Sequence, residues 1–363
     1  MTSEIRGGRP TGRRDTPATA EIRFLCLSFC RQHGRHKDST LVQFGSKDSA
    51  VYSAVYSSVI QTIGRTPLVE LRHCSPNPNV HLFAKLEGWN PTGSVKDRVA
   101  YAMVQEAERQ GRLRPPRTII EASTGNTGIS LAMVGRALGY PVRIVMPENV
   151  YAEIPRVIAA YGGKITWVSA ERGVLGAIDL ARQFAKTDGF CMLDQFSSEA
   201  NLRAHYEGTA PEIVADLQQV DAFVAGVGTA GTLMGVGRRL KETNQSTLVI
   251  AVEPHPGNQV QGLRSLEEGF VPPLLDLGVL DGKILVRSGS AFAATALVMQ
   301  REAIFAGVSS GAVLHGAMKV VSRLRRGNVV LLFADSGWKY LDTNLWTTRL
   351  HPAPEDLDDV MWW

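Results

Sequence analysis

Lys96 is the residue whose surroundings most directly suggest chemistry. It lies in the segment Asn90–Arg98 (NPTGSVKDR), where a turn rich in Pro, Gly and Ser leads into a predicted helix that has the lysine in its first turn. The positive end of a helix dipole favours the neutral form of an amine. A neutral amine can attack a carbonyl carbon and hold it as a Schiff base. Because a single lysine is usually a solvated surface residue, its neighbours must decide between these two interpretations.

A second loop carries an unusual number of hydroxyl and amide groups. The residues Ser123–Gly128 (STGNTG) follow the predicted strand RTIIEAS and open a predicted helix that ends at Gly139. Backbone N–H groups and hydroxyls at a helix N-terminus can bind a carboxylate. One Ser, Thr or Asn would be enough to cap the helix. The longer polar run therefore favours a carboxylate-binding loop over a simple helix cap.

A third loop, Gly226–Thr232 (GVGTAGT), follows the predicted strand DAFVA and precedes a helix. Glycine and threonine at a helix start suit a phosphate group, which backbone N–H groups and hydroxyls can bind. The same residues fit the pattern G-x-G-x-x-G, and Glu253 follows 22 residues after Gly231. A dinucleotide-binding enzyme has an acid at about that position. This loop alone is thus compatible with a phosphate site, a nicotinamide site or a tight turn.

A fourth loop, Gly307–Gly311 (GVSSG), opens another predicted helix and contains Ser309. In isolation Ser309 would be interpreted as a helix cap. Together, the four strand-to-helix loops offer a lysine, a carboxylate-binding loop, a phosphate-binding loop and a separate hydroxyl. This set predicts a pyridoxal 5′-phosphate (PLP) site that handles an amino acid. A nicotinamide-dependent dehydrogenase would need neither Lys96 nor the loop that begins at Ser123.

Repeated strand–helix units must position these loops. Strands are predicted at 80–87, 117–123, 141–147, 164–170, 190–196, 221–228, 246–254 and 328–337, and helices at 95–111, 125–139, 153–162, 174–189, 204–219, 229–244, 295–307 and 309–327. Strands rich in Val, Ile and Leu between helices predict an α/β fold of parallel sheets with helices on both faces. In such open, doubly wound sheets, ligands bind where strands lead into helices.

The number of strands is too large for one small sheet, so we predict two α/β domains. The larger would combine residues 51–90 with 200–350, and the smaller would comprise residues 91–199. Residues 1–50 are predicted to form a disordered leader, because the first 20 are rich in Gly, Pro, Thr and Arg. An export signal is not expected, since Arg23 interrupts the apolar stretch that would have to form its core.

Composition argues against several classes of protein. Of the 363 residues, 44% are hydrophobic and 20% charged, and no apolar run approaches the roughly 18 residues of a membrane span. Residues 1–50 carry nine of the 39 Lys/Arg and five of the 35 Asp/Glu, so the other 313 residues carry 30 of each sign. We therefore predict no nucleic-acid partner and no membrane partner.

The four cysteines, at positions 26, 30, 74 and 191, form no CxxC pair and no cluster with histidines. They predict no metal site, and they suit a cytoplasmic protein in a reducing compartment.

Together these motifs resemble the fold-type II PLP enzymes, which share the fold of the tryptophan synthase β-subunit, and most closely the cysteine synthase group. The likeness runs from Gly64–Leu68 (GRTPL) to Asp335–Tyr340 (DSGWKY), roughly three quarters of the chain. It implies that Lys96 forms the Schiff base with the cofactor. It further implies a phosphate site made by Gly228, Thr229, Ala230, Gly231 and Thr232.

For the other loops, the resemblance implies that Asn126 hydrogen-bonds the cofactor's ring oxygen and that Ser309 faces its pyridine nitrogen. The substrate carboxylate would be bound by Ser123, Thr124, Thr127 and Gln195. The family usually has Pro-Thr-Ser-Gly-Asn-Thr where this chain has Ala122–Thr127 (ASTGNT). The hydroxyls are kept with Ser and Thr exchanged, and Ala230 stands where Gly or Thr is common.

Within that group, residues 253–272 resemble the O-phosphoserine sulfhydrylase branch. The likeness implies that Arg264 binds the substrate's phosphate, which a planar guanidinium suits, although a surface arginine is the simpler alternative. That branch accepts sulfur from a thiocarboxylated sulfur-carrier protein and covers its active site with a C-terminal segment. We therefore expect residues 351–363, an acidic and aromatic tail, to form an active-site lid. The family also implies a homodimer.

The predicted function is a PLP-dependent β-replacement, a transferase step in cysteine biosynthesis. It would make L-cysteine from an activated serine, with O-phosphoserine preferred over O-acetylserine, and from sulfide or a protein thiocarboxylate. Lys96 would remove and return the Cα proton. The alternatives are a cystathionine synthase or hydroxyamino-acid dehydratase of the same fold, a nicotinamide dehydrogenase, and a binding protein without catalysis.

Overall fold

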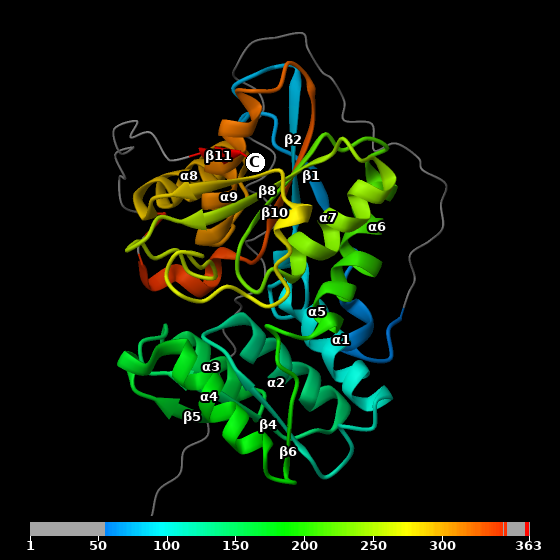
Figure 1. The fold of residues 1–363 in the computed structure, drawn as a ribbon, viewed down its shortest axis with the longest axis vertical. Coiled ribbons are helices and arrows are strands. Elements are labelled where there is room, and N and C mark those ends of the chain that lie inside the picture. The colour runs from blue at the N-terminus through cyan, green and yellow to red at the C-terminus, as the bar shows by residue number, and fades with distance from the viewer. Residues whose placement is uncertain (1–54, 344, 347–359, 363) are drawn as a thin grey trace, which may run out of the picture. The chain divides into compact units, whose positions relative to one another are not determined.

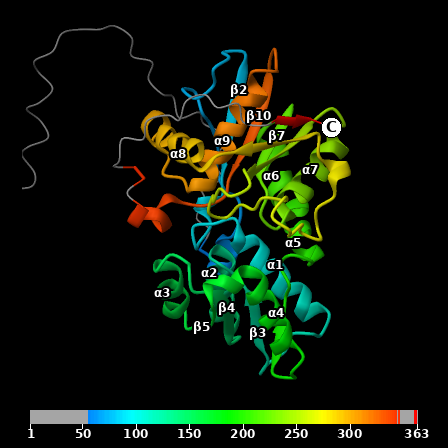
Figure 2. The ribbon, with the colours of Figure 1, turned by 60° about the vertical axis from the view of Figure 1, so that its left-hand side comes forward.

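Two β-sheets organise the molecule. The structure, a computed structural model, describes residues 55–343, 345–346 and 360–362 (Figure 1). The predicted leader at residues 1–50 lies outside the described residues, as do 351–359 and 363 of the predicted lid. The described residues belong to one compact unit, and each sheet has its own set of covering helices (Figures 1 and 2).

The larger sheet has seven strands in the order β1-β2-β10-β7-β8-β9-β11. Its strands are β1 (Leu68–Glu70), β2 (Val80–Leu86), β7 (Ala222–Gly226), β8 (Leu248–Pro254), β9 (Gly282–Val286), β10 (Gly327–Phe333) and β11 (Val360–Trp362). The five inner strands are parallel, and β1 and β11 lie antiparallel at the two edges. The inner strands are fully buried over most of their length, which explains why they read as continuous apolar runs.

The smaller sheet has four parallel strands in the order β5-β4-β3-β6. They are β3 (Thr118–Ala122), β4 (Val142–Pro147), β5 (Lys164–Val168) and β6 (Phe190–Met192). All four strands come from the chain segment between β2 and β7, so the smaller sheet is an insertion into the larger one.

Helices cover both faces of each sheet. Next to the smaller sheet lie α1 (Lys96–Arg109), α2 (Asn126–Leu138), α3 (Glu153–Ala160) and α4 (Gly173–Ala185). Next to the larger sheet lie α6 (Ala210–Asp216), α7 (Gly231–Thr243), α8 (Ser288–Glu302) and α9 (Val308–Val321), and α5 (Glu199–Ala204) links the two groups. Four separate buried clusters fill the layers: α8 and α9 pack on one face of the larger sheet and α6 and α7 on the other (Figure 1). Likewise α1, α2 and α3 cover one face of the smaller sheet and α4 the other.

The predicted α/β fold class is therefore confirmed, with differences in single elements. The predicted helix at 204–219 is interrupted: α5 passes through a π-helical turn, η4 (His205–Thr209), before α6 begins next to Pro211. A proline in a helix interior removes a hydrogen bond and clashes with the preceding turn. The strand predicted at 190–196 ends at Met192, and β1, β9 and β11 are strands that the prediction lacked. The predicted domain boundaries stay a prediction.

The described end of the tail, Val360–Trp362, lies at a sheet edge, and the active-site lid stays a prediction. Strand β11 pairs with β9, and Trp362 lies opposite Gly282, the first residue of β9. The loops with the candidate chemistry lie at the other, carboxyl ends of the parallel strands. An edge strand has unpaired backbone N–H and C=O groups, which β11 satisfies. No helix of the described residues is long and apolar enough to span a membrane.

Candidate active site

A network of buried hydrogen bonds holds the loop before Lys96. The carboxylate of Asp97 accepts hydrogen bonds from the backbone N–H and the hydroxyl of Thr92, at 2.7 and 2.5 Å, and from the hydroxyl of Ser130 at 2.6 Å. Asp97 thereby ties the turn to α2, which carries Asn126. Thr92 and Asp97 of the segment NPTGSVKDR thus fix the position from which Lys96 projects.

Arg98 anchors the same helix to the larger sheet. Its guanidinium donates to Glu87 at 2.8 and 2.9 Å and to Glu212 at 2.6 and 2.7 Å. Burial alone would raise the pKa of Glu212, but the hydrogen bonds and charges of Arg98 and Lys85 outweigh it and lower that pKa to about 2. These charges fix α1 against β2 and α6.

The Lys96 amine loses its proton more easily than that of an ordinary lysine. Burial, as the largest cause, lowers its pKa to about 8, with help from the charge of Lys339, while Asp335 and Glu87 act in the opposite direction. Among the described residues no hydrogen bond or ion pair reaches its Nζ atom. Burial therefore supplies the depressed pKa for which the sequence offered only a helix terminus. A half-buried amine with no hydrogen-bond partner and a lowered pKa is suited to act as a nucleophile or a base.

The glycine-threonine loop lines a cavity of about 40 Å³ beside Lys96, together with Ser309. Ala230 has a left-handed backbone, with φ of 66°, and α7 begins at the next residue. A Cβ atom on Gly231 would lie 2.1 Å from the side-chain oxygen of Asn201. Asn201 in turn donates to the Thr229 hydroxyl at 2.8 Å. The loop is thus a close-fitting cradle of N–H groups and hydroxyls at a helix N-terminus, as a phosphate requires.

The hydroxyl of Thr232 is supported from behind by a histidine. It lies 3.2 Å from Nε2 of His205, whose Nδ1 lies 3.0 Å from the Thr209 hydroxyl. Burial, followed by the charges of Lys96 and Arg98, lowers the pKa of His205 well below its usual value. His205 is therefore neutral and orients Thr232 without adding a charge to the cradle.

The polar loop after β3 lines a second cavity, of about 70 Å³, that shares Lys96, Gly228 and Thr229 with the first. The predicted carboxylate ligands Ser123, Thr124, Thr127 and Gln195 all line it. Gln195 accepts from the Thr127 hydroxyl at 2.7 Å and donates to the backbone oxygen of Ala122 at 2.7 Å. Because an amide nitrogen has two hydrogens, Gln195 keeps one N–H for a ligand.

Ser123 also has a structural role in this loop. Its hydroxyl oxygen accepts from the backbone N–H groups of Gly125 and Gly128, at 3.1 and 3.0 Å. Ser123 therefore shapes the turn, as the helix-cap interpretation predicts. Thr124 is half-buried and lines two cavities, where it is available to a ligand.

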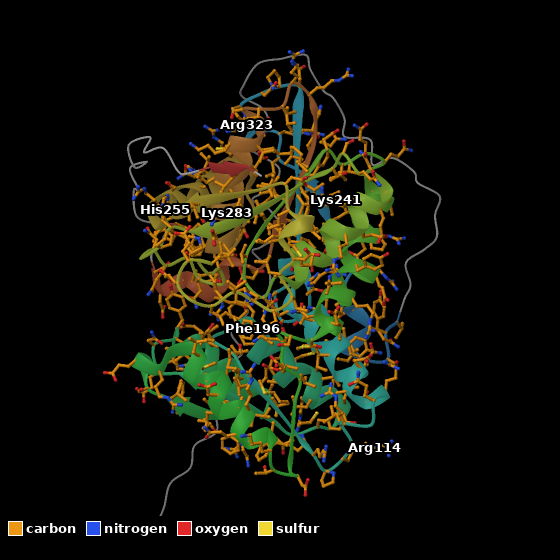
Figure 3. The ribbon with its side chains drawn as sticks, viewed as in Figure 1. Arg114, Phe196, Lys241, His255, Lys283 and Arg323 are labelled. Carbon is orange, nitrogen blue, oxygen red and sulfur yellow. The ribbon has the colours of Figure 1, made fainter. Side chains whose placement is uncertain are left out.

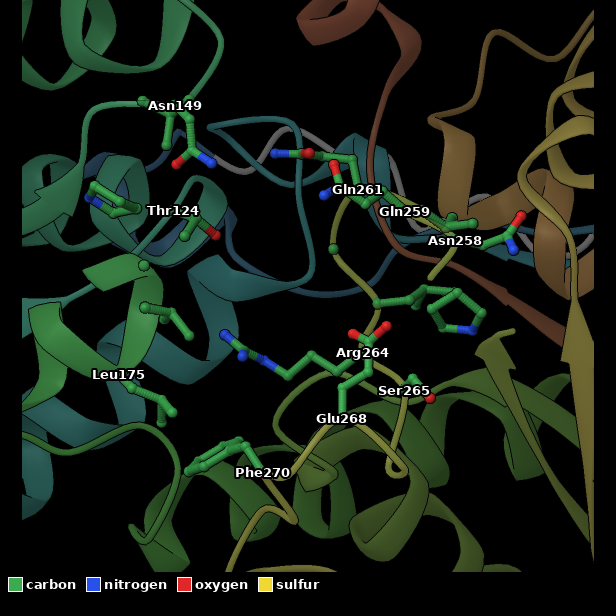
Figure 4. Close-up of a pocket in the computed structure, with 18 residues that line it drawn as sticks. Thr124, Asn149, Leu175, Asn258, Gln259, Gln261, Arg264, Ser265, Glu268 and Phe270 are labelled. Atoms are coloured by element: carbon green, nitrogen blue, oxygen red, sulfur yellow. The ribbon is translucent and has the colours of Figure 1, made fainter. Parts of the chain in front are cut away.

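Arg264 enters the site from the loop after β8. It lines both the 70 Å³ cavity and an adjoining one of about 320 Å³ (Figure 4). Its guanidinium lies 5.1 Å from the ring centre of Phe196 and 5.4 Å from that of Phe270, which hold it between the two sheets' loops (Figures 3 and 4). Within the described part of the chain, no hydrogen bond or ion pair reaches this guanidinium. The simpler alternative, a solvated surface arginine, does not fit its surroundings.

Glu253 does not face a ligand. It is fully buried, one carboxylate oxygen accepts from the backbone N–H of Leu266 at 2.6 Å, and the other lies 2.7 Å from Nζ of Lys283. An acid used in this way cannot bind a ribose hydroxyl, so the geometry does not support the nicotinamide alternative. Instead Glu253 fixes the loop that carries Arg264. The backbone N–H of Arg264 also donates to the backbone oxygen of Val227 at 2.8 Å.

Several residues of the site have no counterpart in the sequence prediction. Asn201 and His205 support the phosphate cradle from α5 and η4, and Asp335 and Lys339 flank Asn126. The last two belong to the segment Asp335–Tyr340, which the family resemblance singled out without assigning a role. Asn201 carried no signal at all, because its partner Thr229 lies 28 residues away.

The residues that line the two smaller cavities fit PLP. The Lys96 amine, an anion-binding helix N-terminus and the Ser309 hydroxyl line one small cavity, and a second polar loop opens beside the amine. Among the described residues, no Asp or Glu that would repel a phosphate lines the cavity beside the cradle. This donor set matches a cofactor with an aldehyde, a phosphate and a ring nitrogen.

Comparison with known proteins agrees with this chemistry. Residues 59–335 match the family described as pyridoxal-phosphate-dependent enzyme, and the chain belongs to this family. Within it, the chain is a member of the cysteine synthase group of fold-type II enzymes and uses PLP. The predicted family and cofactor are therefore confirmed.

The relatives and solved structures are similar over most of their length. A cysteine synthase of Aquifex aeolicus is 38% identical over 82% of this chain and 94% of its own, and cysteine synthase B of Escherichia coli is 37% identical over 80% and 96%. The crystal structure of a cysteine synthase from Entamoeba histolytica has a TM-score of 0.78 at 32% identity, over 84% and 95% of the two chains. That of an O-ureido-L-serine synthase has a TM-score of 0.77 at 35% identity, over 83% and 98%. These similarities support a β-replacement of the cysteine synthase type.

Proposed function

We propose that this enzyme makes L-cysteine from O-phosphoserine in preference to O-acetylserine. The observation that carries the choice is the Arg264 guanidinium, which is enclosed by Phe196 and Phe270 and has no carboxylate partner among the described residues. This guanidinium is half-buried, so leaving it without a counter-ion is costly, and a bound dianion would reduce that cost. A phosphate ester offers such a dianion and an acetate ester does not.

The cofactor and the protein divide the chemistry. When bound, PLP withdraws the electron pair that remains at Cα after a proton leaves an amino acid. Lys96 would hold the cofactor's aldehyde until the substrate arrives. Its freed Nζ atom, whose pKa is lowered to about 8, would then take the Cα proton and later return it. One group thus serves as both base and acid, because an amine with a pKa near the working pH can do either.

The other loops position the two reactants. The N–H groups and hydroxyls of Gly228–Thr232 would bind the cofactor's phosphate, and Ser309 would face the pyridine nitrogen. A neutral hydroxyl, unlike a carboxylate, does not require that nitrogen to be protonated. Ser123, Thr124, Thr127 and Gln195 would bind the substrate carboxylate. Arg264 would then bind the leaving phosphate, since it lines the same cavity as this loop.

The sulfur donor is proposed to be sulfide or a protein thiocarboxylate. The cavity of about 320 Å³ adjoins the substrate loop at Thr124 and Arg264, and the residues that line it come from the loops of both sheets. It has room for more than sulfide, which supports a donor that enters as an extended chain end. We further propose a homodimer, on the family's precedent.

Two other reactions of the same fold remain alternatives. A hydroxyamino-acid dehydratase would release a keto acid and ammonia from serine without any sulfur compound. A cystathionine synthase would accept homocysteine in place of sulfide. Both are tested by product analysis with serine alone and with homocysteine, where this proposal predicts negligible turnover.

The test of the proposal is a comparison of kcat/KM for O-phosphoserine and O-acetylserine with sulfide as the second substrate. The proteins are wild type, Arg264→Gln, and Arg287→Gln as a control, an exposed arginine that follows β9 outside the three cavities. Loss of a charged hydrogen bond is expected to lower kcat/KM for O-phosphoserine by about 10- to 100-fold and to change that for O-acetylserine by less than about threefold. A wild-type preference for O-acetylserine, or an equal loss for both substrates, would contradict the proposal.

A further inference from the structure

The side-chain amide of Asn126 is bonded at both ends by charged groups. Its nitrogen donates to a carboxylate oxygen of Asp335 at 2.7 Å, and its oxygen accepts from Nζ of Lys339 at 2.5 Å. Asp335 and Lys339 are each 2% exposed. Nothing in the sequence places them near Asn126, since they follow it by 209 and 213 residues.

The chemistry of these two partners allows only one orientation of the amide. An ionised carboxylate can only accept hydrogen bonds, and an ammonium group can only donate them. The same Asp335 oxygen also accepts from the Tyr340 hydroxyl at 2.8 Å, and Nζ of Lys339 also donates to the backbone oxygen of Gly93 at 3.2 Å. If the Asn126 amide rotated by half a turn, both of its hydrogen bonds would become repulsive contacts inside a dry site.

The fixed orientation leaves one amide hydrogen unused. The Asn126 nitrogen has two hydrogens, of which Asp335 takes one. Asn126 lines the cavity that also contains Lys96, so the second hydrogen is available to a ligand there. The ring oxygen of PLP is an acceptor, so it gains from an N–H donor and is repelled by a carbonyl oxygen. The orientation of this one amide therefore decides whether Asn126 helps or opposes cofactor binding.

The backbone of the same segment ties the locking residues to the other loops. The backbone oxygen of Asp335 accepts from Gly307 at 2.9 Å, two residues before Ser309. The backbone oxygen of Ala334 accepts from Val95 at 2.8 Å, immediately before Lys96. The lock is therefore held in place by the same loops that present the amine and the hydroxyl.

We propose that Asp335 and Lys339 are positioning residues that lock the Asn126 amide with its N–H toward the cofactor ring. The proposal rests on the assignment of Asn126 to the ring oxygen. It does not depend on the substrate or on the sulfur donor.

The test measures the dissociation constant of PLP from the cofactor-free protein, for a double-mutant cycle of Lys339→Met and Asn126→Ala. In the wild-type background, Lys339→Met is expected to weaken PLP binding by about 10-fold. In the Asn126→Ala background its effect is expected to be clearly smaller, because the amide through which Lys339 acts is gone and only its charge beside Lys96 is lost. Lys241→Met, which removes a lysine paired with Asp281 near the far end of α7, is the control and should leave the constant unchanged.

A second variant guards against a folding defect. Asp335→Asn combined with Lys339→Met removes both charges at once, so neither of the two is left buried without the other. It is expected to keep the unfolding temperature of the cofactor-free protein close to that of wild type and to weaken PLP binding by about 10-fold.

Three results would overturn the lock. One is that Lys339→Met weakens PLP binding equally in the wild-type and the Asn126→Ala backgrounds. Another is that the Asp335→Asn, Lys339→Met variant binds PLP as tightly as wild type. The third is an Asn126→Ala protein that binds PLP as wild type does, which would also remove the assignment of Asn126. Cysteine formation enters none of these measurements, so a failure here is distinct from a failure of the proposed substrate preference.

Discussion

At the scale of the residue, the site depends on a few side chains whose charge state is set by burial. Lys96 loses its ordinary basicity chiefly because it is removed from water, with Lys339 adding to the effect and Asp335 opposing it. His205 is neutral for the same reason and supports the phosphate cradle through Thr232. Arg264 keeps its charge in a partly apolar setting between two rings. Each group is thereby suited to a different task within one small volume.

The lowered pKa of Lys96 predicts its reactivity in the cofactor-free protein. A group with a pKa of about 8 is half neutral at pH 8, where a lysine in a peptide, with a pKa of about 10.4, is almost fully charged. We expect acetylation of Lys96 to rise with a midpoint near pH 8, as followed by mass spectrometry of peptides. A midpoint near that of a free lysine would show that burial does not depress this amine.

The sequence predicted the residues that line the two smaller cavities better than those that orient them. Lys96, Asn126, Gly228–Thr232 and Ser309 were found because each belongs to a short motif at a strand–helix junction. The structure brings them together, while their roles toward the cofactor stay predictions. Asn201, Asp335 and Lys339 were not assigned, because they act through partners far along the chain, and no local pattern encodes such a contact.

At the scale of the element, helix α1 holds Lys96 in place, and α1 is attached to both sheets. Its apolar face packs in the core of the smaller sheet, and Arg98 reaches Glu87 beside β2 and Glu212 on α6. The motif residues around Lys96 therefore secure a helix that joins two separately wound sheets. The prediction of this helix from periodicity was correct, but its ion pairs could not be foreseen, since Glu212 lies 114 residues away.

Removal of the Arg98 charge should destabilise the whole fold. Arg98→Met leaves Glu87, which is fully buried, without its guanidinium partner. We expect the free energy of unfolding in urea to fall by about 3–5 kcal/mol, the usual cost of breaking a buried pair. Arg109→Met on the same helix removes an exposed pair with Glu106 and should change the stability little. Equal effects of the two substitutions would contradict the anchoring role of Arg98.

At the scale of the whole molecule, two sheets wound from one chain place their carboxyl ends around a shared site. The loop after β7 supplies the phosphate cradle, the loop after β8 supplies Arg264, and the segment after β10 supplies Asp335 and Lys339. The loops after β3 and β6 supply the predicted carboxylate ligands. The alternation of strands and helices was sufficient to predict this class of fold. The edge strands β1 and β11 were not predicted, because three-residue strands depend on the neighbour they pair with and carry too few residues for a pattern.

Glu121 makes the stability of the molecule depend on pH. This carboxyl on β3 is fully buried, and burial, followed by the charge of Asp194, raises its pKa from 4.5 to about 8. Between these values the folded state holds a proton that the unfolded state has lost, so stability falls as the pH rises. Glu121→Gln mimics the protonated form and should unfold at a higher temperature than wild type, by a margin that grows between pH 5.5 and pH 8. A margin that stays constant would contradict the raised pKa.

Lys96 is expected to be the lysine that carries the cofactor. Lys339 is the strongest competitor for this role, because it is a buried lysine that lies beside Asn126. Reduction of the PLP-loaded protein with borohydride, followed by peptide mapping, fixes the cofactor to the lysine that holds it. We expect one labelled peptide, with the reduced cofactor on Lys96, and no label in a Lys96→Ala variant. Label on Lys339, or on any other lysine of the wild-type protein, would contradict it.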